Sequence, residues 1–357
     1  MGRTSPILFC YTQGPQSLRF APSVSIFPTP MERIALITGA TGFVGGHLAE
    51  HLAAEGWKLR ALVRPTSDTA RLRALGAELR MGDLDAVDAL AAAADGADTV
   101  FHLAGATTAP SEAAFRRANA EGTRNVVAGV LRAGNRPRRL VYASSFAACG
   151  PAVDGRPRRV DETPAPITAY GRSKLAGEAE ARAAAGDRVE VVVLRVPAVY
   201  GPGDRASFLP LFRLVKRRLA PLPAGPERRA QLIYVADLVR AFARAAGAAP
   251  GTYAVAAPRA HPFGELLGEI AAAVGTTPLR IPIPPALFRA AGTLAGRWGD
   301  LLGGAGVFNR EKAEEVLAEA WECDLSGSEA LLPPDEAMPL GRGTAETARW
   351  YRTQGWL

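Results

Sequence analysis

The stretch Thr38-Gly39-Ala40-Thr41-Gly42-Phe43-Val44-Gly45 decides how this chain folds. The apolar run Ile34–Thr38 in front of it predicts a buried strand, and Gly45–Glu55 behind it predicts a helix. Its first glycine permits a tight turn, its second lets a phosphate approach the backbone, and its third lets helix and strand pack closely. The N–H groups at the helix start would then face the phosphates. The stretch therefore predicts a Rossmann-type dinucleotide site.

Short apolar runs alternate with amphipathic ones from this turn to about residue 201. The predicted strands are Ile34–Thr38, Lys58–Val63, Glu78–Met81, Thr99–Leu103, Arg139–Ser144 and Val189–Arg195. The predicted helices are Gly45–Glu55, Thr69–Leu75, Val87–Ala94, Phe115–Ala133 and one within Pro164–Ala185. This order predicts an α/β fold of the Rossmann type, with a doubly wound parallel sheet and right-handed crossovers.

We expect three parts along the chain. Residues 1–30 hold two arginines and no acidic residue, without helical periodicity, and predict a disordered extension. Residues 31–201 form the predicted nucleotide-binding domain, and residues 202–357 a smaller, mainly helical substrate lobe. The predicted elements of the lobe are helices Phe208–Arg218, Val235–Ala246, Gly264–Val274 and Arg310–Glu319, with a late strand at Gly251–Val255. Within it, Gln231–Val235 is expected to return to the main sheet.

The composition argues against several functional classes. The net charge of +7 comes almost wholly from Arg in a chain rich in Ala and Gly, which indicates coding bias rather than nucleic-acid binding. Short basic clusters such as Lys216–Arg218 are interpreted as solvated surface. The alternative, for one of these clusters, is a binding site for an anionic ligand. Cys10, Cys149 and Cys323 are too few for a disulfide framework or a metal site, and fit a cytoplasmic protein. No apolar run approaches the roughly 20 residues of a membrane span.

The end of the second predicted strand indicates how the ribose of a dinucleotide would be recognised. An acidic residue there would bind the 2′-hydroxyl of NAD and repel a 2′-phosphate. This strand instead ends in Arg64, and Arg71 follows in the next predicted helix. A guanidinium suits a phosphate, so we expect NADP(H), with NAD as the alternative; otherwise Arg64 only faces solvent. Asp83 and Leu84 are expected to flank the adenine.

The segment Tyr170-Gly171-Arg172-Ser173-Lys174 lies in a predicted helix. Tyr170 and Lys174 are four residues apart and therefore share one helix face. Tyrosine, with an ordinary pKa of about 10, is a poor base at neutral pH, but a nearby ammonium group stabilises the phenolate. Tyr170 would then move a proton to or from a substrate oxygen. Ser144-Ser145 ends the preceding strand, where such sheets bind ligands, and would hold that oxygen.

These stretches together resemble the extended branch of the short-chain dehydrogenase/reductase superfamily, from Arg33 to the C-terminus. The matching pieces are Thr38–Gly45, Gly82–Leu84, His102–Ala106, Asn119–Thr123, Ala143–Ser145, Tyr170–Lys174 and Leu194–Pro202. The resemblance implies that Ser145, Tyr170 and Lys174 are catalytic, and its spacing favours Ser145 over Ser144. The predicted cofactor-binding residues are Gly39, Thr41, Gly42, Phe43, Val44, Gly45, Arg64, Arg71, Asp83, Leu84, Leu103, Ala104, Asn119, Tyr170, Lys174, Pro197 and Val199.

Within that superfamily two functions compete. Nucleotide-sugar epimerases and dehydratases carry an Asn where this chain has Val196-Pro197, and the Thr-Asp-Glu run of the dehydratases is absent. The segment Leu194–Arg205 and Arg64 look more like dihydroflavonol reductases and 3β-hydroxysteroid dehydrogenases. The resemblance therefore implies an NADP(H)-dependent oxidoreductase that interconverts a secondary alcohol and a ketone on a moderately hydrophobic, sterol- or flavonoid-like small molecule. The alternatives are an NAD-dependent nucleotide-sugar epimerase and, third, a catalytically silent cofactor-binding regulatory protein.

Two stretches of the predicted lobe, Ile281–Phe288 and Leu294–Leu302, are strongly apolar. The simpler interpretation is that they pack the lobe onto the main domain. The other is a hydrophobic lid, or a segment in weak peripheral contact with a membrane that supplies a lipid-like substrate. Tyr234–Asp237 resembles a segment that closes the substrate pocket in this superfamily. The resemblance also leads us to expect a homodimer formed through two long helices of each subunit.

Overall fold

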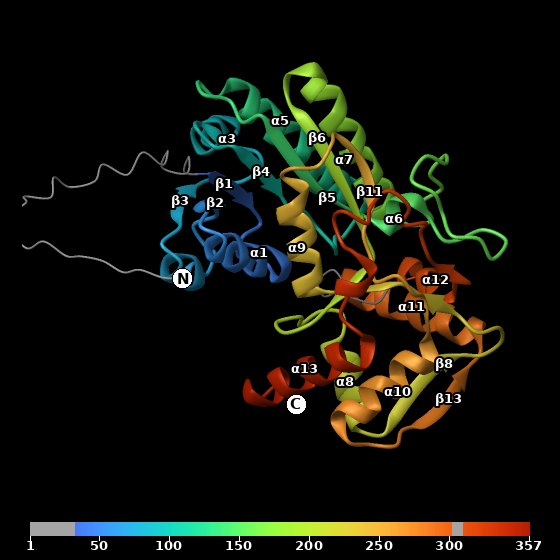
Figure 1. Cartoon of the computed structure of the whole chain (residues 1–357). Helices are drawn as coiled ribbons and strands as arrows, with labels where there is room; N and C mark the ends of the chain where they lie inside the picture. The colour runs from blue at the N-terminus through green and yellow to red at the C-terminus, as the bar shows by residue number, and fades with distance from the viewer. Residues whose placement is uncertain (1–32, 302–309) are drawn as a thin grey trace, which may run out of the picture. The chain divides into compact units, whose positions relative to one another are not determined.

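Seven parallel strands form the central sheet of the computed structural model, which describes residues 33–301 and 310–357 (Figure 1). In spatial order they are β3 (Glu78–Met81), β2 (Lys58–Val63), β1 (Ile34–Thr38), β4 (Thr99–His102), β5 (Arg139–Ser145), β6 (Glu190–Val196) and β11 (Gly251–Ala254). The order of strands along the chain reverses between β1 and β4, which is where doubly wound sheets bind ligands. The predicted Rossmann-type fold is confirmed. The predicted extension, residues 1–30, lies outside the described residues.

Helices cover both faces of this sheet. One face carries α1 (Phe43–Ala54) and α9 (Val235–Ala245); the other carries α3 (Val87–Ala94), α5 (Gly122–Arg132) and α7 (Ala169–Ala185) (Figure 1). Successive strand residues point to opposite faces, so Ile37 of β1 packs with α1 and α9 while Leu36 packs with α3 and α5. Both side chains are 1% exposed, as expected of a sheet buried on both sides.

The predicted helix Phe115–Ala133 begins earlier and changes pitch along its length. It starts as α4 (Glu112–Arg116), where the Ser111 hydroxyl accepts the N–H of Ala114 at 3.2 Å. A π-helical turn (Arg117–Glu121) then leads into α5. Such turns are frequent at functional sites, and this one contains the buried Asn119.

Residues 202–357 contribute to more than one part of the fold. Helix α9 packs on α1, and β11 pairs with β6, with Tyr253 opposite Leu194. The prediction that Gln231–Val235 returns to the main sheet is wrong, because β10 (Leu232–Tyr234) pairs with β7 (Ala198–Tyr200) in a separate two-stranded sheet. Pro197 lies between β6 and β7 and has no N–H to continue the ladder.

A second hydrophobic core lies among C-terminal elements. Phe212 of α8 (Leu209–Lys216), Ile270 of α10 (Phe263–Val274) and Tyr351 of α13 (Leu340–Thr353) are fully buried there. The other described elements are α2 (Ala70–Ala74), α6 (Phe146–Cys149), β8 (Leu219–Pro223), β9 (Arg229–Ala230), β12 (His261–Pro262), β13 (Leu279–Ile283), α11 (Pro285–Leu301), α12 (Arg310–Leu317) and β14 (Ala320–Trp321), with 3₁₀ turns at Gly186–Arg188 and Pro334–Glu336. Within residues 33–301 and 310–357, no helix is both long and apolar enough to cross a bilayer.

Candidate active site

The glycine-rich turn connects β1 to α1 at the switch point of the sheet. Gly39 has a φ of +77°, and a Cβ there would lie 2.7 Å from the Ala104 nitrogen. A Cβ at Gly45 would lie only 2.1 Å from the Gly39 oxygen. Gly42 is the N-cap of α1, so no side chain caps this helix, and its first turn has no acidic residue. The turn therefore fits a pyrophosphate, which its backbone N–H groups would bind.

Substituting Gly45 by Ala is expected to weaken NADP(H) binding by at least about ten-fold, or roughly 1.4 kcal/mol. The added methyl group would collide with backbone, so the turn itself must open. Titration of the purified protein with NADPH, followed by fluorescence, measures this. Gly264→Ala is the matched control, because a Cβ there meets nothing within 4 Å. Unchanged affinity in Gly45→Ala would show that the turn does not hold the cofactor.

A chain of buried, hydrogen-bonded polar groups lies at the carboxyl ends of β1 and β4, next to the glycine turn. Thr38 Oγ1 lies 2.7 Å from His102 Nδ1, and His102 Nε2 lies 3.0 Å from Thr123 Oγ1. Burial, together with the charge of Lys174, lowers the pKa of His102 to about 3. The imidazole is therefore neutral and bridges β1, β4 and α5.

Asn119 connects the loop after β4 to α7, the helix that carries two members of the predicted catalytic triad (Ser145, Tyr170 and Lys174). Its Nδ2 donates to Ser173 Oγ at 2.8 Å and to the Ala106 oxygen at 2.9 Å, while its Oδ1 accepts the Ala106 N–H at 2.8 Å. A Cβ at Gly105 would lie 2.6 Å from that Oδ1. Asn119 therefore positions the Gly105–Ala106 backbone, and its role in cofactor binding stays a prediction.

Ser145 and Tyr170 come together at the carboxyl end of the sheet. Ser145 ends β5 and caps α6, accepting the N–H of Ala147 at 3.1 Å. Tyr170 lies in the first turn of α7, where the Thr168 hydroxyl accepts the Gly171 N–H at 3.1 Å. Burial raises the pKa of Tyr170 to about 12, and a hydrogen bond from Ser145 opposes that shift. Deprotonation of this phenol therefore needs a positive charge nearby.

Lys174 lies one helical turn beyond Tyr170 and is 6% exposed. Its Nζ lies 4.3 Å from the centre of the Tyr142 ring, and no acceptor among the described residues bonds to it. Burial lowers the pKa of Lys174 to about 7, against the opposing effect of the Glu178 carboxylate. A buried ammonium group without an acceptor fits a site where ligand hydroxyls, such as those of a ribose, complete its hydrogen bonds.

Replacing Lys174 with Met is expected to stabilise the cofactor-free protein at pH 6 and to have little effect at pH 10. The pKa of Lys174 is lower in the folded protein than in the unfolded chain, where it is about 10.4. Its charge therefore destabilises the fold fully below pH 7, and the penalty disappears as pH rises toward 10. Melting temperatures at the two pH values test this, with the exposed Lys216→Met as control. A loss of stability at pH 6 would contradict it.

A buried ion pair behind the triad was missed from the sequence. Glu178 is 1% exposed and accepts two bonds from Arg195, at 2.9 and 2.8 Å, and one from the Ser144 hydroxyl at 2.5 Å. Glu178 stands four residues after Lys174, on the same face of α7, and this spacing is the signal that could have identified it. It connects α7 to β5 and β6, so it fixes the helix that carries Tyr170.

Helix α12 lies against the start of α7. Glu311 accepts the Ala169 N–H at 2.9 Å and pairs with Arg172 at 3.3 Å. The Thr168 hydroxyl donates to Glu315 at 3.5 Å, and the Glu315 carboxylate adds to the rise in the Tyr170 pKa. A C-terminal element therefore borders the candidate site, as a substrate-binding part should.

The two arginines predicted to bind a 2′-phosphate differ in their surroundings. Thr38 of β1 pairs with Leu62 of β2, so Arg64 extends beyond the sheet edge beside the glycine turn. Arg64 is exposed and forms no ion pair among the described residues. Arg71 instead donates to Glu50 of α1 at 2.5 Å and lies 3.5 Å from His47. Arg64 is therefore the better placed to meet a ligand.

The remaining predicted cofactor residues line the same edge. Asp83 Oδ1 accepts the N–H groups of Asp85 and Ala86, which starts the turn into α3. The Asn125 amide donates to the Leu84 oxygen at 2.9 Å. The others lie in the glycine turn, directly after β4, or beside the β6–β7 junction: Thr41, Phe43, Val44, Leu103, Ala104, Pro197 and Val199. Their contact with a cofactor stays a prediction.

Two cysteines that are far apart in sequence meet in the interior. Cys149 Sγ and Cys323 Sγ lie 4.0 Å apart, and both residues are buried. No sequence pattern predicts this contact, which joins α6 to the segment after β14. No group of three or more His, Cys, Asp or Glu side chains is placed to bind a metal within residues 33–301 and 310–357.

Comparison with known proteins identifies the family of this chain. The family described as "NAD dependent epimerase/dehydratase family" matches residues 35–256. A ceramide reductase of Caulobacter vibrioides is 32% identical over 336 residues, covering 92% of this chain and 98% of that protein. A putative dihydroflavonol 4-reductase of Synechocystis is 37% identical over 175 residues, covering 47% and 50% of the two chains.

The solved structure of MoeE5 in complex with UDP-glucose and NAD has a TM-score of 0.69 and 26% identity. The similarity covers 90% of this chain and 99% of that one. The resemblance drawn from the sequence motifs is confirmed. The chain therefore belongs to the NAD-dependent epimerase/dehydratase family, in the extended short-chain dehydrogenase/reductase superfamily, and is an NAD(P)-dependent enzyme of that type.

Proposed function

We propose that this protein is an NADP(H)-dependent oxidoreductase that interconverts a secondary alcohol and a ketone on a moderately hydrophobic small molecule in the cytoplasm. One observation carries the proposal: the Tyr170 phenol, whose pKa Ser145 lowers, stands one helical turn before a buried ammonium group that has no acceptor among the described residues. This pairing suits proton transfer at a substrate oxygen.

The proposed chemistry divides between the cofactor and the side chains. Bound NADP(H) supplies or accepts the hydride. Ser145 donates a hydrogen bond to the substrate oxygen and orients it. Tyr170 gives its phenolic proton to that oxygen in the direction of reduction and takes it back in the direction of oxidation. The Lys174 ammonium stabilises the phenolate, opposing the effect of burial on the Tyr170 pKa.

The substrate class is proposed from relatives and from the surroundings of the site. The ceramide reductase aligns with nearly the whole chain, and the name of the dihydroflavonol relative also denotes a reductase. Both support reduction of a lipid-, sterol- or flavonoid-like ketone. Val196-Pro197 stands where a sugar-nucleotide enzyme would carry an Asn, which disfavours the alternative of a nucleotide-sugar epimerase. The complete triad disfavours a catalytically silent binding protein.

The test is consumption of NADPH by the purified protein with a panel of long-chain, sterol and flavonoid ketones, and with UDP-glucose. Net oxidation of NADPH by an apolar ketone supports the proposal. An epimerase would instead retain bound NAD, convert UDP-glucose and leave added NADPH unchanged. Cofactor binding without turnover of any compound in the panel would favour the regulatory alternative.

Replacing Arg64 with Asp is expected to shift the ratio of NADP to NAD affinity by about 10- to 100-fold toward NAD. A hydrogen-bonded guanidinium–phosphate contact contributes about 1.5–3 kcal/mol, and the new carboxylate would repel the 2′-phosphate. Dissociation constants for both cofactors give the ratio. Arg73→Asp is the matched control, since Arg73 is also exposed and, within the described part of the chain, its side chain bonds only Thr69. An unchanged ratio would assign the recognition to another residue.

A further inference from the structure

The positive charge of this chain is concentrated in two segments. Residues 205–226 and 270–299 contain eight Lys or Arg residues and no Asp or Glu. The whole chain carries +7, so everything outside these segments sums to −1. Coding bias alone would distribute arginines evenly along the chain, and it would not exclude Asp and Glu from two segments. The charge is therefore a local property of one part of the fold.

Exposed leucines accompany this charge. Leu219 of β8 and Leu279 of β13 are direct partners in the parallel pair of strands and are 38% and 68% exposed. Four exposed cations adjoin them in sequence: Lys216, Arg217, Arg218 and Arg280. None of the four forms an ion pair with a residue of the described ranges. Exposed leucines beside unpaired cations are suited to a surface that is both apolar and anionic.

The helix that follows β13 in the sequence, α11, also carries exposed leucines. Leu287 and Leu294 of α11 are two turns apart and therefore on one face, and they are 58% and 57% exposed. Ala290 and Ala291, between them, are exposed as well. Arg289 is paired with Glu314 at 2.9 Å. An apolar helix face that stays in solvent is expected to have a partner.

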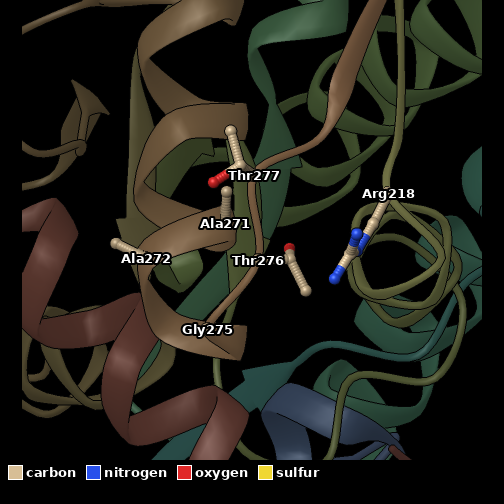
Figure 2. Close-up of a pocket in the computed structure, with 6 residues that line it drawn as sticks. All are labelled: Arg218, Ala271, Ala272, Gly275, Thr276 and Thr277. Carbon is tan, nitrogen blue, oxygen red and sulfur yellow. The ribbon is translucent and has the colours of Figure 1, made fainter.

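An open cavity of about 330 Å³ lies beside the basic cluster. It is lined by Arg218 and by the end of α10 with its following turn, which includes Thr276 and Thr277. In Figure 2 the Arg218 guanidinium extends toward Thr276. A guanidinium and hydroxyl groups are suited to the phosphate of a lipid headgroup.

We propose that β8, β13 and α11 form a docking surface for a bilayer that contains anionic phospholipid. The leucines enter the interfacial region and the four cations bind headgroup phosphates. Helix α11 pairs with α12 through Arg289 and Glu314, and α12 contacts α7 through Glu311. The docked surface therefore lies next to elements that border the candidate active site, where a membrane-resident substrate would arrive.

Cosedimentation of the full-length protein with vesicles tests the proposal without any measurement of activity. Vesicles of phosphatidylcholine and phosphatidylglycerol in equal parts are expected to bind the protein, and phosphatidylcholine alone to bind it far more weakly. Arg217→Glu/Arg218→Glu/Arg280→Glu should weaken binding by about 100-fold. Arg124→Glu/Arg136→Glu/Arg188→Glu is the control with the same net charge, on exposed residues outside the surface, and should bind like the wild type.

A second set of variants tests the apolar part. Leu279→Ser/Leu287→Ser/Leu294→Ser should also reduce vesicle binding, whereas Met81→Ser, which changes an equally exposed side chain elsewhere, should not. Circular dichroism confirms that each variant is folded. Equal vesicle binding by both triple variants and the wild type would overturn the proposal. So would a serine variant that changes the oligomeric mass but not vesicle binding, because the surface would then join two copies of the chain.

Discussion

Tyr170→Phe is expected to lower kcat by about 10²- to 10⁴-fold while NADPH binds with unchanged affinity. The substitution removes one hydroxyl group, the one whose pKa Ser145 lowers. Packing should survive, because the Tyr170 ring contacts the Phe115 ring, with centroids 6.0 Å apart, and Phe keeps that contact. Steady-state rates with an accepted ketone, together with an NADPH titration, separate catalysis from binding.

Tyr253→Phe is the matched control for this experiment. The Tyr253 hydroxyl donates to the Ala249 oxygen at 2.9 Å on the far edge strand β11, so its loss should leave kcat unchanged. A Tyr170→Phe enzyme with wild-type kcat would show that another group transfers the proton. A variant that lost NADPH affinity and activity together would instead indicate that Tyr170 serves mainly to hold the cofactor.

Glu178→Gln is expected to lower the free energy of unfolding by about 3–5 kcal/mol. The substitution leaves the Arg195 guanidinium, 4% exposed, without its carboxylate. An uncompensated charge in the interior is costly because nothing replaces its lost hydration. Urea denaturation followed by tryptophan fluorescence gives the change. The residual activity of the folded variant should also fall, since Glu178 positions the helix that carries Tyr170 and Lys174.

Glu112→Gln is the control, because Glu112 forms an equally well aligned pair with Arg172 at 2.7 and 3.0 Å in an exposed setting. Surface pairs contribute about 1 kcal/mol or less, so this variant should be nearly as stable as the wild type. Similar losses in the two variants would mean that burial of the Glu178–Arg195 pair has no special effect.

Much of the fold could be predicted because its signals are local. The boundaries of β1, β2, β3 and α3 agree with the predicted runs, since each is a short apolar or alanine-rich segment between turn residues. The strand predictions were wrong where a strand pairs with a segment far away in the sequence. Residues 231–235 have the composition of a buried strand, but composition does not say which strand they join, and β7 lies more than thirty residues earlier. The π-helical turn at Arg117–Glu121 likewise depends on where Asn119 finds its partners.

In the candidate site, too, some features follow from the local sequence and others from tertiary packing. The glycine turn and the four-residue step from Tyr170 to Lys174 are local geometry, so the sequence by itself determined them, and with them the family. Only the tertiary structure decided that Arg71 bonds Glu50, that Glu178 joins Arg195, and that α12 borders Tyr170. These contacts form between residues far apart in the chain, whose meeting depends on how whole elements pack. The same holds for the exposed leucines of β8, β13 and α11 and for the cations next to Leu219 and Leu279. These residues can be read from the sequence, but their exposure, and the absence of ion pairs between those cations and other described residues, are properties of the fold.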